Sequence, residues 1–407
     1  MATATNDALE RRHPIRDPRF RRLWAGSTVS MCGDQFYLVA LPWLVLHLTG
    51  SAVAMGTILM AAAVPRAVLM LMGGAFSDRV SPRRILMTTA SARAVLVGAI
   101  GVLVGVGAIR LWHLYLLGFA FGIADAFAMP ASQAFLPSLV GREDLVAANS
   151  LVQSTAQLTT IVGPAPAGLV IKAVGTVWAF AFDAVSFLFI PAALWTLADP
   201  ARDPPASGRP PVWRSIDEGL RYVLRDVPLR TLVLLASAIN FCLSGPIGVG
   251  LPYLTKTRFN SPTAFGVAVS AVAAGGLLGA SLAGVWRVRH RGILILAVSS
   301  VLGFCLGSMG VLPSLPAIAA VLLVMGTCAG FANVQIMAWL QQRVEASVRG
   351  RVMSVLMLPG MGLLPVSLAV AGLLAAWSLP MLFVIAAATL LAVATVAALN
   401  RTVREIR

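Results

Sequence analysis

The chain has 407 residues, of which 58% are hydrophobic and 12% charged, and its mean hydropathy is +0.86. Soluble domains carry about 25% charged residues, so this composition excludes a soluble protein and predicts an all-α integral membrane protein. The formal net charge of +15 does not indicate a nucleic-acid partner, because the arginines lie in short loops between apolar runs rather than on one basic face.

Residues 1–21 are predicted to form a cytoplasmic tail, because they are rich in arginine and lack the apolar core of a cleavable signal peptide. Twelve apolar segments follow, and each is long enough to cross a bilayer. Backbone groups in lipid must be paired within the chain, so each segment is predicted to be a helix. The predicted spans are 22–47, 52–76, 85–109, 111–137, 147–171, 176–197, 231–255, 262–286, 292–312, 315–340, 352–374 and 378–399.

Basic residues are distributed unevenly between the predicted loops. If the N-terminus is cytoplasmic, the tails and cytoplasmic loops contain 25 of the 31 lysines and arginines. The outer loops contain only Arg110, Lys172, Lys256 and Arg258. Because positively charged loops remain in the cytoplasm, both termini, including the tail 400–407, are predicted to be cytoplasmic, and the protein to be a multi-pass protein of the inner (plasma) membrane.

The longest polar interval, 198–230, is predicted to be a cytoplasmic linker between an N-terminal half, 22–197, and a C-terminal half, 231–399. After a proline-rich start it carries apolar residues at steps of three and four: Trp213, Ile216, Leu220, Val223 and Leu224. This spacing predicts an amphipathic helix over 211–227 that lies at the membrane interface.

The two halves repeat one another. A shift of 210 residues places Cys32 on Cys242, Leu41-Pro42 on Leu251-Pro252, Ser51 on Ser261 and Gly56 on Gly266. A shift of 208 places Gly122 on Gly330 and Asp125 on Asn333. The predicted fold is therefore twelve transmembrane helices in two six-helix repeats, an architecture in which a central site can alternate between the two sides.

The loop after the second predicted span is short, polar and basic. It contains two glycines, one acid and three arginines: Gly73, Gly74, Asp78, Arg79, Arg83 and Arg84. The pattern resembles the G-x-x-x-D-R-x-G-R-R loop of the major facilitator superfamily of transporters, with Ser81-Pro82 near the place of the inner glycine. The resemblance implies a gating loop, and the alternative is a signal for membrane topology alone.

Three acids lie within predicted spans, where ionisable residues are costly and mark a pathway or a charge pair. Asp34 and Asp125 lie near mid-membrane and are candidate proton carriers, because loss of hydration favours the neutral form of a carboxyl group. The alternative for both is a fixed ion pair with Arg66 or Arg93. Such a pair is the favoured role of Asp183, because sixth helices are peripheral in the superfamily that the loop resembles.

The fifth predicted span carries a polar stripe that is expected to face the bundle interior: Asn149, Gln153, Gln157, Thr160 and Pro164. The stripe continues into 163–168, where Gly163, Pro164 and Gly168 resemble the G-P-x-x-G-G motif of superfamily antiporters. The alternative is a kinked helix that packs tightly. Further cavity candidates mix polar and soft apolar character: Gln35, Tyr37, Asn240, Ser244, Asn333, Gln335 and Met361.

No enzyme signature is found in the sequence. Neither Lys172 nor Lys256 follows a phosphate-binding glycine pattern, and the histidines and cysteines have no metal-ligand spacing. We therefore expect a protein without catalytic activity, cofactor or metal, which does not power transport with an ATP site of its own.

Three segments carry a closer resemblance: 41–51 with 63–66, then 144–150, and 182–187. They resemble the bacterial twelve-helix drug–proton antiporters, which are related to macrolide-efflux proteins and enterobactin-type siderophore exporters. The resemblance implies a secondary transporter that exports a small amphipathic compound in exchange for protons, and the expected assembly is a monomer in the lipid bilayer. Two features depart from it: helix four lacks the family's arginine motif, and 284–291, the second-half counterpart of the gating loop, has no acid. A lipid or lysolipid flippase and a non-transporting receptor or scaffold are the alternatives.

Overall fold

The computed structural model describes residues 14–77, 80–141, 143–195, 197, 212–286, 288, 290–345, 352–353, 355 and 360–400. These residues fold into helices joined by short turns. The first group of helices comprises η2 (Pro14–Arg16), α1 (Pro18–Thr49), α2 (Ala52–Ser77), α3 (Pro82–Gly105), α4 (Leu111–Phe135), η3 (Leu136–Ser138), α5 (Leu145–Val162), α6 (Pro164–Val174) and α7 (Thr176–Trp195). The remaining helices are α8 (Val212–Arg225), α9 (Val227–Gly245), η4 (Pro246–Gly250), α10 (Leu251–Phe259), α11 (Pro262–Val285), α12 (Arg291–Met309), α13 (Leu315–Arg343), α15 (Leu364–Trp377) and α16 (Leu379–Leu399).

Ten helices of the described chain are long and apolar enough to cross a membrane, and eleven if the bent pair α5 and α6 is one span. The predicted fifth span, 147–171, is therefore broken: α5 ends at Val162, α6 begins at Pro164, and their axes differ by 42°. Proline lacks the N–H that would continue the hydrogen-bond ladder, which explains the break. The predicted eleventh span, 352–374, overlaps the shorter apolar helix α15, which continues to Trp377, and includes residues outside the described ranges.

Residues that are paired by the sequence repeat have equivalent roles at the starts of helices. The Ser51 hydroxyl accepts a hydrogen bond from the Ala54 N–H at 3.2 Å, and the Ser261 hydroxyl accepts one from the Ala264 N–H at 3.2 Å. Each serine satisfies a backbone donor in the first turn of its helix. The helix before Ser51 ends at Thr49 and is capped by Gly50, whose φ of 61° is left-handed.

Paired glycines also occupy equivalent helix contacts. A Cβ atom on Gly56 of α2 would lie 2.6 Å from the Leu368 carbonyl oxygen of α15, and one on Gly266 of α11 would overlap the backbone of Pro164 at the start of α6. These two contacts join the first group of helices to the second. Because only glycine permits such backbone approach, the repeat specifies where the two groups of helices meet.

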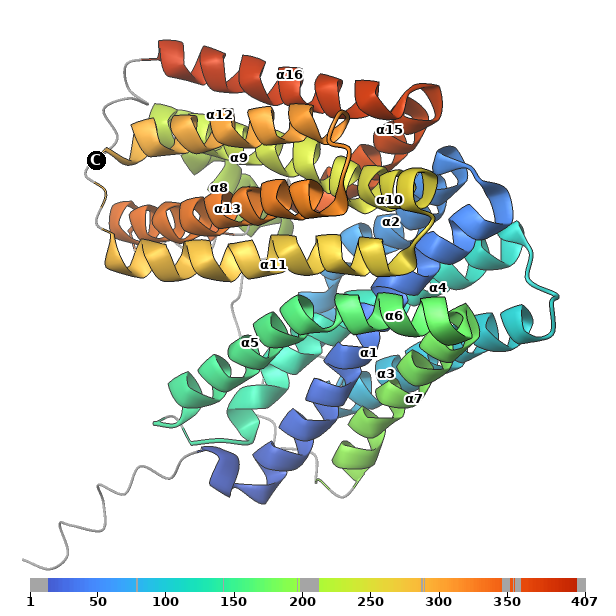
Figure 1. Cartoon of the computed structure of the whole chain (residues 1–407). Coiled ribbons are helices and arrows are strands. Elements are labelled where there is room, and N and C mark those ends of the chain that lie inside the picture. The colour runs from blue at the N-terminus through green and yellow to red at the C-terminus, as the bar shows by residue number, and fades with distance from the viewer. Residues whose placement is uncertain are drawn as a thin grey trace, which may run out of the picture.

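Figure 1 shows the blue-to-green helices α1–α7 on one side of the molecule and α9–α16 on the other. They meet where α2 contacts α15 and where α6 contacts α11. Between the groups in sequence, α8 contacts α9 and α2. Val223 of α8 is buried, whereas Leu220 and Leu224 are exposed, so α8 keeps an apolar surface outside the helix bundle.

Candidate functional site

A cavity of about 530 Å³ lies between the two groups of helices. Its volume is in the range of sites for drug-sized molecules. One wall comes from α1, α2 and α4, and the other from η4, α11 and α15. The site is therefore built from sequence-distant elements of both repeats.

The two walls differ in chemistry. All the ionisable groups that line the cavity lie on the first wall: Asp34, Tyr37, Arg66 and Asp125. The second wall is apolar and consists of Ile247, Gly248, Phe265, Val269, Leu364 and Leu368. Charge recognition is thus confined to one wall, while the other offers shape and apolar surface.

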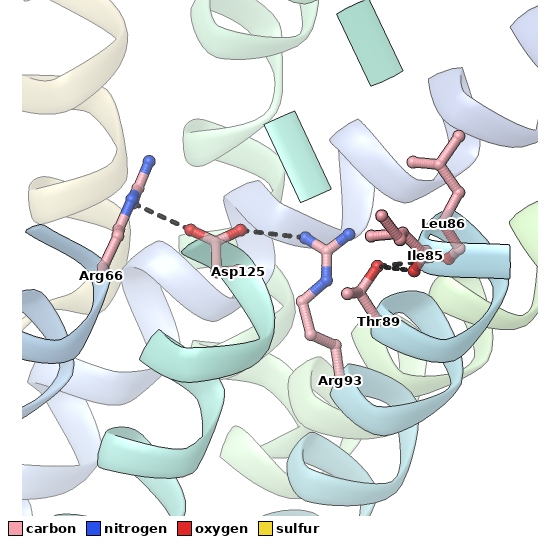
Figure 2. A network of polar contacts seen from close by, with 6 residues as sticks. All are labelled: Arg66, Ile85, Leu86, Thr89, Arg93 and Asp125. Atoms are coloured by element: carbon pink, nitrogen blue, oxygen red, sulfur yellow. Dashed lines mark hydrogen bonds and ion pairs between the residues drawn. The ribbon is translucent and has the colours of Figure 1, made fainter. Parts of the chain in front are cut away.

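Asp125 of α4 is bound by two arginines from neighbouring helices. Arg66 of α2 lies 3.1 Å from Asp125 Oδ2, and Arg93 of α3 donates a hydrogen bond to Asp125 Oδ1 at 3.2 Å. Figure 2 shows the carboxylate between the two guanidinium groups. The Arg66 side chain is 47% exposed and that of Arg93 only 9%, so Arg66 faces the cavity and Arg93 the protein interior. Two positively charged side chains therefore contact the Asp125 carboxylate in this conformation.

The meeting of Arg66 with Asp125 follows from a close helix contact one turn away. A Cβ atom on Gly122 of α4 would overlap the Ala62 carbonyl oxygen of α2 and lie 2.9 Å from Pro65. Arg66 follows Ala62 by four residues and Asp125 follows Gly122 by three, so both side chains emerge beside the contact. Gly330 makes the equivalent approach to Gly276 in the second group of helices.

Asp34 of α1 lies in the same cavity without a direct partner. No hydrogen bond or ion pair reaches its carboxyl from the described residues. The charged groups that act on it are Arg93, Asp125 and Arg66. The structure thus separates the two candidate acids: Asp125 is in the ion pair that was its alternative role, and Asp34 has no direct partner among the described residues.

Tyr37, one turn from Asp34, forms an aromatic surface at the cavity. Its ring stacks on Phe121 with centroids 4.7 Å apart and meets Phe180 edge-on at 6.2 Å. The Tyr37 hydroxyl is buried without a hydrogen-bond partner in the described part of the chain. The cavity therefore offers an aromatic face beside the Asp34 carboxyl group.

Asp183 of α7 differs from its expected arrangement. The predicted ion pair with Arg66 or Arg93 is absent from the described residues, and the side chain is fully buried rather than peripheral. The reason is that α7 packs along both α1 and α3. Neither carboxyl oxygen of Asp183 has a hydrogen-bond partner among the residues described.

The antiporter-like segment of the fifth span lies at the junction between the two groups. The Thr263 hydroxyl donates to the Gly168 carbonyl oxygen at 3.2 Å, and the Gln157 side chain donates to the Ala273 carbonyl oxygen at 3.3 Å. A Cβ atom on Gly163 would lie 2.5 Å from Gln35 Cγ. Gln153 is exposed. The antiporter-like and the tight-packing interpretations both predict a close contact at this segment. The structure contains that contact and does not distinguish the two interpretations.

Of the predicted cavity residues, only Tyr37 lines this cavity. Gln35 donates to the Met31 carbonyl oxygen of its own helix, and Asn240 to that of Ala236. Gln335 is buried and donates to the Trp286 carbonyl oxygen at 3.1 Å, while Asn333 is exposed on α13. Polar character within a span therefore did not identify the face that meets the cavity.

The predicted gating loop is only partly described. Asp78 and Arg79 lie outside the described residues, and Gly73 and Gly74 fall in the last turns of α2. Arg83 donates to the Leu194 and Trp195 carbonyl oxygens at 3.0 and 3.2 Å. It thereby stabilises the C-terminal end of α7, where backbone carbonyls lack partners within the helix.

A contact that sequence reasoning missed joins the groups near the paired glycines. The Lys256 ammonium of α10 lies 4.5 Å from the ring centroid of Trp43 on α1, a cation–π geometry. Lys256 also donates to Asn260 at 2.8 Å. Nothing in the spacing of Trp43 and Lys256 signals this pair, because it depends on how the two groups meet.

Comparisons with known proteins identify the family of the chain. A family model described as transmembrane secretion effector matches residues 11–407. The chain is 31% identical over 385 residues to the multidrug efflux pump Tap of Mycolicibacterium fortuitum, covering 90% of this chain and 94% of that one. It is 24% identical over 299 residues to the enterobactin exporter EntS of Shigella boydii, covering 73% and 70%.

Solved structures share the fold at low sequence identity. The nucleoside transporter NupG matches with a TM-score of 0.76 and 12% identity, covering 94% of this chain and 98% of that one. A bacterial homologue of the iron transporter ferroportin in its inward-facing state matches with a TM-score of 0.72 and 18% identity, covering 93% and 98%. The family match and these relatives identify a multi-pass transporter of the inner membrane rather than an enzyme. The chain belongs to the transmembrane secretion effector family of the major facilitator superfamily.

Proposed function

We propose that this protein is a proton-coupled exporter of small amphipathic compounds that works by alternating access. In this proposal twelve spans form two six-helix halves, 22–197 and 231–399, and the linker 198–230 joins them. The tails 1–21 and 400–407 are cytoplasmic, and the working unit is a monomer. The proton gradient supplies the energy, so no cofactor is required.

The observation that carries the proposal is the pairing pattern of the acids in the central cavity. Asp125 is neutralised by Arg66 and Arg93, whereas Asp34 lies in the same cavity with no direct partner. A carboxyl group without a counter-charge in a poorly hydrated site gains most by binding a proton or a cationic group. Proton and cargo then compete for Asp34, which is the simplest physical route to antiport.

The contacts between the halves support a conformation in which the cavity receives its cargo from the cytoplasm. Contacts at Gly56, Gly168, Gly266 and the Trp43–Lys256 pair cluster at one end of the molecule, beside the turns that follow α1, α6 and α10. In the proposed orientation this end faces outward. Export then requires these contacts to open and the opposite end to close.

The cargo class is inferred from the walls and the relatives. The apolar second wall, with Phe265, Leu364 and Leu368, and the stacked Tyr37 and Phe121 favour an amphipathic compound with apolar bulk. The relatives named as a multidrug efflux pump and an enterobactin exporter support drug-like, macrolide-like or siderophore-like cargo.

The test is transport into everted inner-membrane vesicles that contain the full chain, with and without a proton gradient. Ethidium, erythromycin and enterobactin serve as probes for the three cargo classes. We expect gradient-driven accumulation of at least one probe. The variant Asp34→Asn should abolish uphill accumulation and retain downhill exchange, because asparagine cannot release a proton.

The matched control is Asp217→Asn. Asp217 is an exposed acid of α8 that pairs with Arg221 at 2.7 Å, away from the cavity. Its variant should transport like the wild type. The proposal is contradicted if the wild type accumulates none of the three probes. It is also contradicted if uphill transport by Asp34→Asn equals that of the control.

A further inference from the structure

The buried carboxyl of Asp183 is the group that the proposed mechanism leaves unused. It is fully buried, and neither of its oxygens has a hydrogen-bond partner among the described residues. The Ser186 hydroxyl beside it donates to the Asp183 backbone carbonyl at 2.7 Å. A buried, unpaired carboxylate is among the most costly groups in a protein.

The fold makes specific room for this acid. A Cβ atom on Gly33 of α1 would overlap the Ser186 hydroxyl and lie 2.6 Å from Asp183 Oδ1, so these two side chains of α7 together occupy the space that a side chain at Gly33 would fill. Gly33 directly precedes Asp34. The surroundings of Asp183 are aromatic. The ring centroids of Phe182 and Phe36 lie 4.5 Å apart, and Phe180 and Phe187, on the same helix as Asp183, are fully buried.

The ionisable groups that face Asp183 come from two packed helices. They are Asp34 and Tyr37 of α1 and Arg93 of α3, while α6, which also contacts α7, contributes none in the described structure. The Arg93 guanidinium lies 4.5 Å from the Phe187 ring centroid, and Phe187 is one helical turn from Asp183. Arg93 also has a buried Nε with no partner among these residues.

The intramembrane arginines are unevenly shared between the buried acids. Both intramembrane arginines, Arg66 and Arg93, are bound to Asp125, and Asp183 has none. We propose that Asp183 is a second proton-holding site, neutral in this conformation, and that Arg93 transfers from Asp125 to Asp183 when that proton leaves. The O–H bond of the Asp183 carboxyl breaks, and its proton passes to the Asp34 carboxylate or to water in the cavity. Arg93 then neutralises the new carboxylate and Asp125 keeps Arg66, so each arginine has one acid.

This inference rests on the proposed proton coupling but is tested without transport. Infrared spectroscopy of the purified full chain reports the C=O stretch of protonated carboxyl groups. At neutral pH we expect a band that Asp183→Asn removes, equivalent to one protonated carboxyl per molecule, and that Asp34→Asn does not remove. The exposed acid variant Asp217→Asn is the control and should leave the band unchanged.

The decisive variant retains Asp183. In Asp125→Asn, Arg93 loses its partner and should turn to Asp183, so the band should disappear although Asp183 is intact. Adding Arg93→Gln to Asp125→Asn should restore it. A band that persists in Asp183→Asn overturns the proton site, and one that persists in Asp125→Asn overturns the transfer of Arg93.

The two Asp125 variants keep the test valid if Asp183→Asn fails to fold, because the single and double variants then decide it together. The outcomes are also distinguishable from failure of the proposed function. A wild type that accumulates no probe in vesicles contradicts export, whereas the infrared bands report the protonation of Asp183 in either case.

Discussion

Gly56 is the residue at which a single added methyl group should shift the balance between the two proposed conformations. In the contact between α2 and α15, a Cβ atom at this position would lie 2.6 Å from the Leu368 carbonyl oxygen and 3.1 Å from the Gly372 Cα. Both neighbours are backbone atoms, so no side-chain rotation can relieve the overlap. Ordinary van der Waals contact begins at 3.4 Å, and Gly56→Ala therefore requires about 0.8 Å of separation between the two helices.

The cost of that separation can be set against the conformational equilibrium. Overpacking of a tight contact costs about 1–3 kcal/mol, which corresponds to about 5- to 150-fold in an equilibrium constant. The contact exists only while this end of the molecule is closed in the proposed mechanism. Gly56→Ala should therefore shift the population toward the form in which this end is open.

Distances between spin labels on the two groups of helices measure this shift. Val106 after α3 and Val311 after α12 are exposed and lie at the end where the groups meet, so labels there report its opening. The control is Gly276→Ala, since a Cβ atom on Gly276 meets no atom within 4 Å. We expect longer distances in Gly56→Ala and a wild-type distribution in the control. Equal distributions in both variants would refute the reasoning.

Two further predictions concern the loop after α2. Asp78→Asn should preserve expression and orientation but strongly reduce transport if the loop gates the cycle, and unchanged transport rates in vesicles would leave only a topological role. Arg83→Gln removes two hydrogen bonds from a charged donor to the end of α7, so it should lower the free energy of unfolding by about 1–3 kcal/mol. Thermal unfolding in detergent measures that loss, and an unchanged midpoint would show that solvent replaces Arg83.

Helix positions were the part of the fold most open to prediction from sequence. Apolar length and the need to pair every backbone group determine them. The pairing of Ser51 with Ser261 and of Gly56 with Gly266 also predicted equivalent positions, because start signals and close contacts are local properties. The break between α5 and α6 agrees with the kinked-helix alternative given for 163–168, and Pro164 at the start of α6 is its local signal.

The partners of the buried charges were less predictable. The sequence offered Arg66 or Arg93 to each acid, but the choice depends on helix approach. Gly122 against Ala62 brings Arg66 to Asp125, whereas Gly33 places Asp183 against α1 without a counter-charge. The apolar wall could not be predicted from the sequence, for a different reason. A leucine that lines a cavity and one that lies in a core have the same composition and the same helical spacing.

The division of the cavity into one ionisable and one apolar wall has an evolutionary consequence. Apolar attraction depends on contact area rather than direction, so substitutions among Ile247, Val269 and Leu368 can change which molecules fit without moving a charged group. In the proposed exporter, cargo range and energy supply then vary independently. Substitutions in the second repeat alone change the range of compounds that fit, while the ionisable residues of the first repeat keep the role in proton coupling proposed for them.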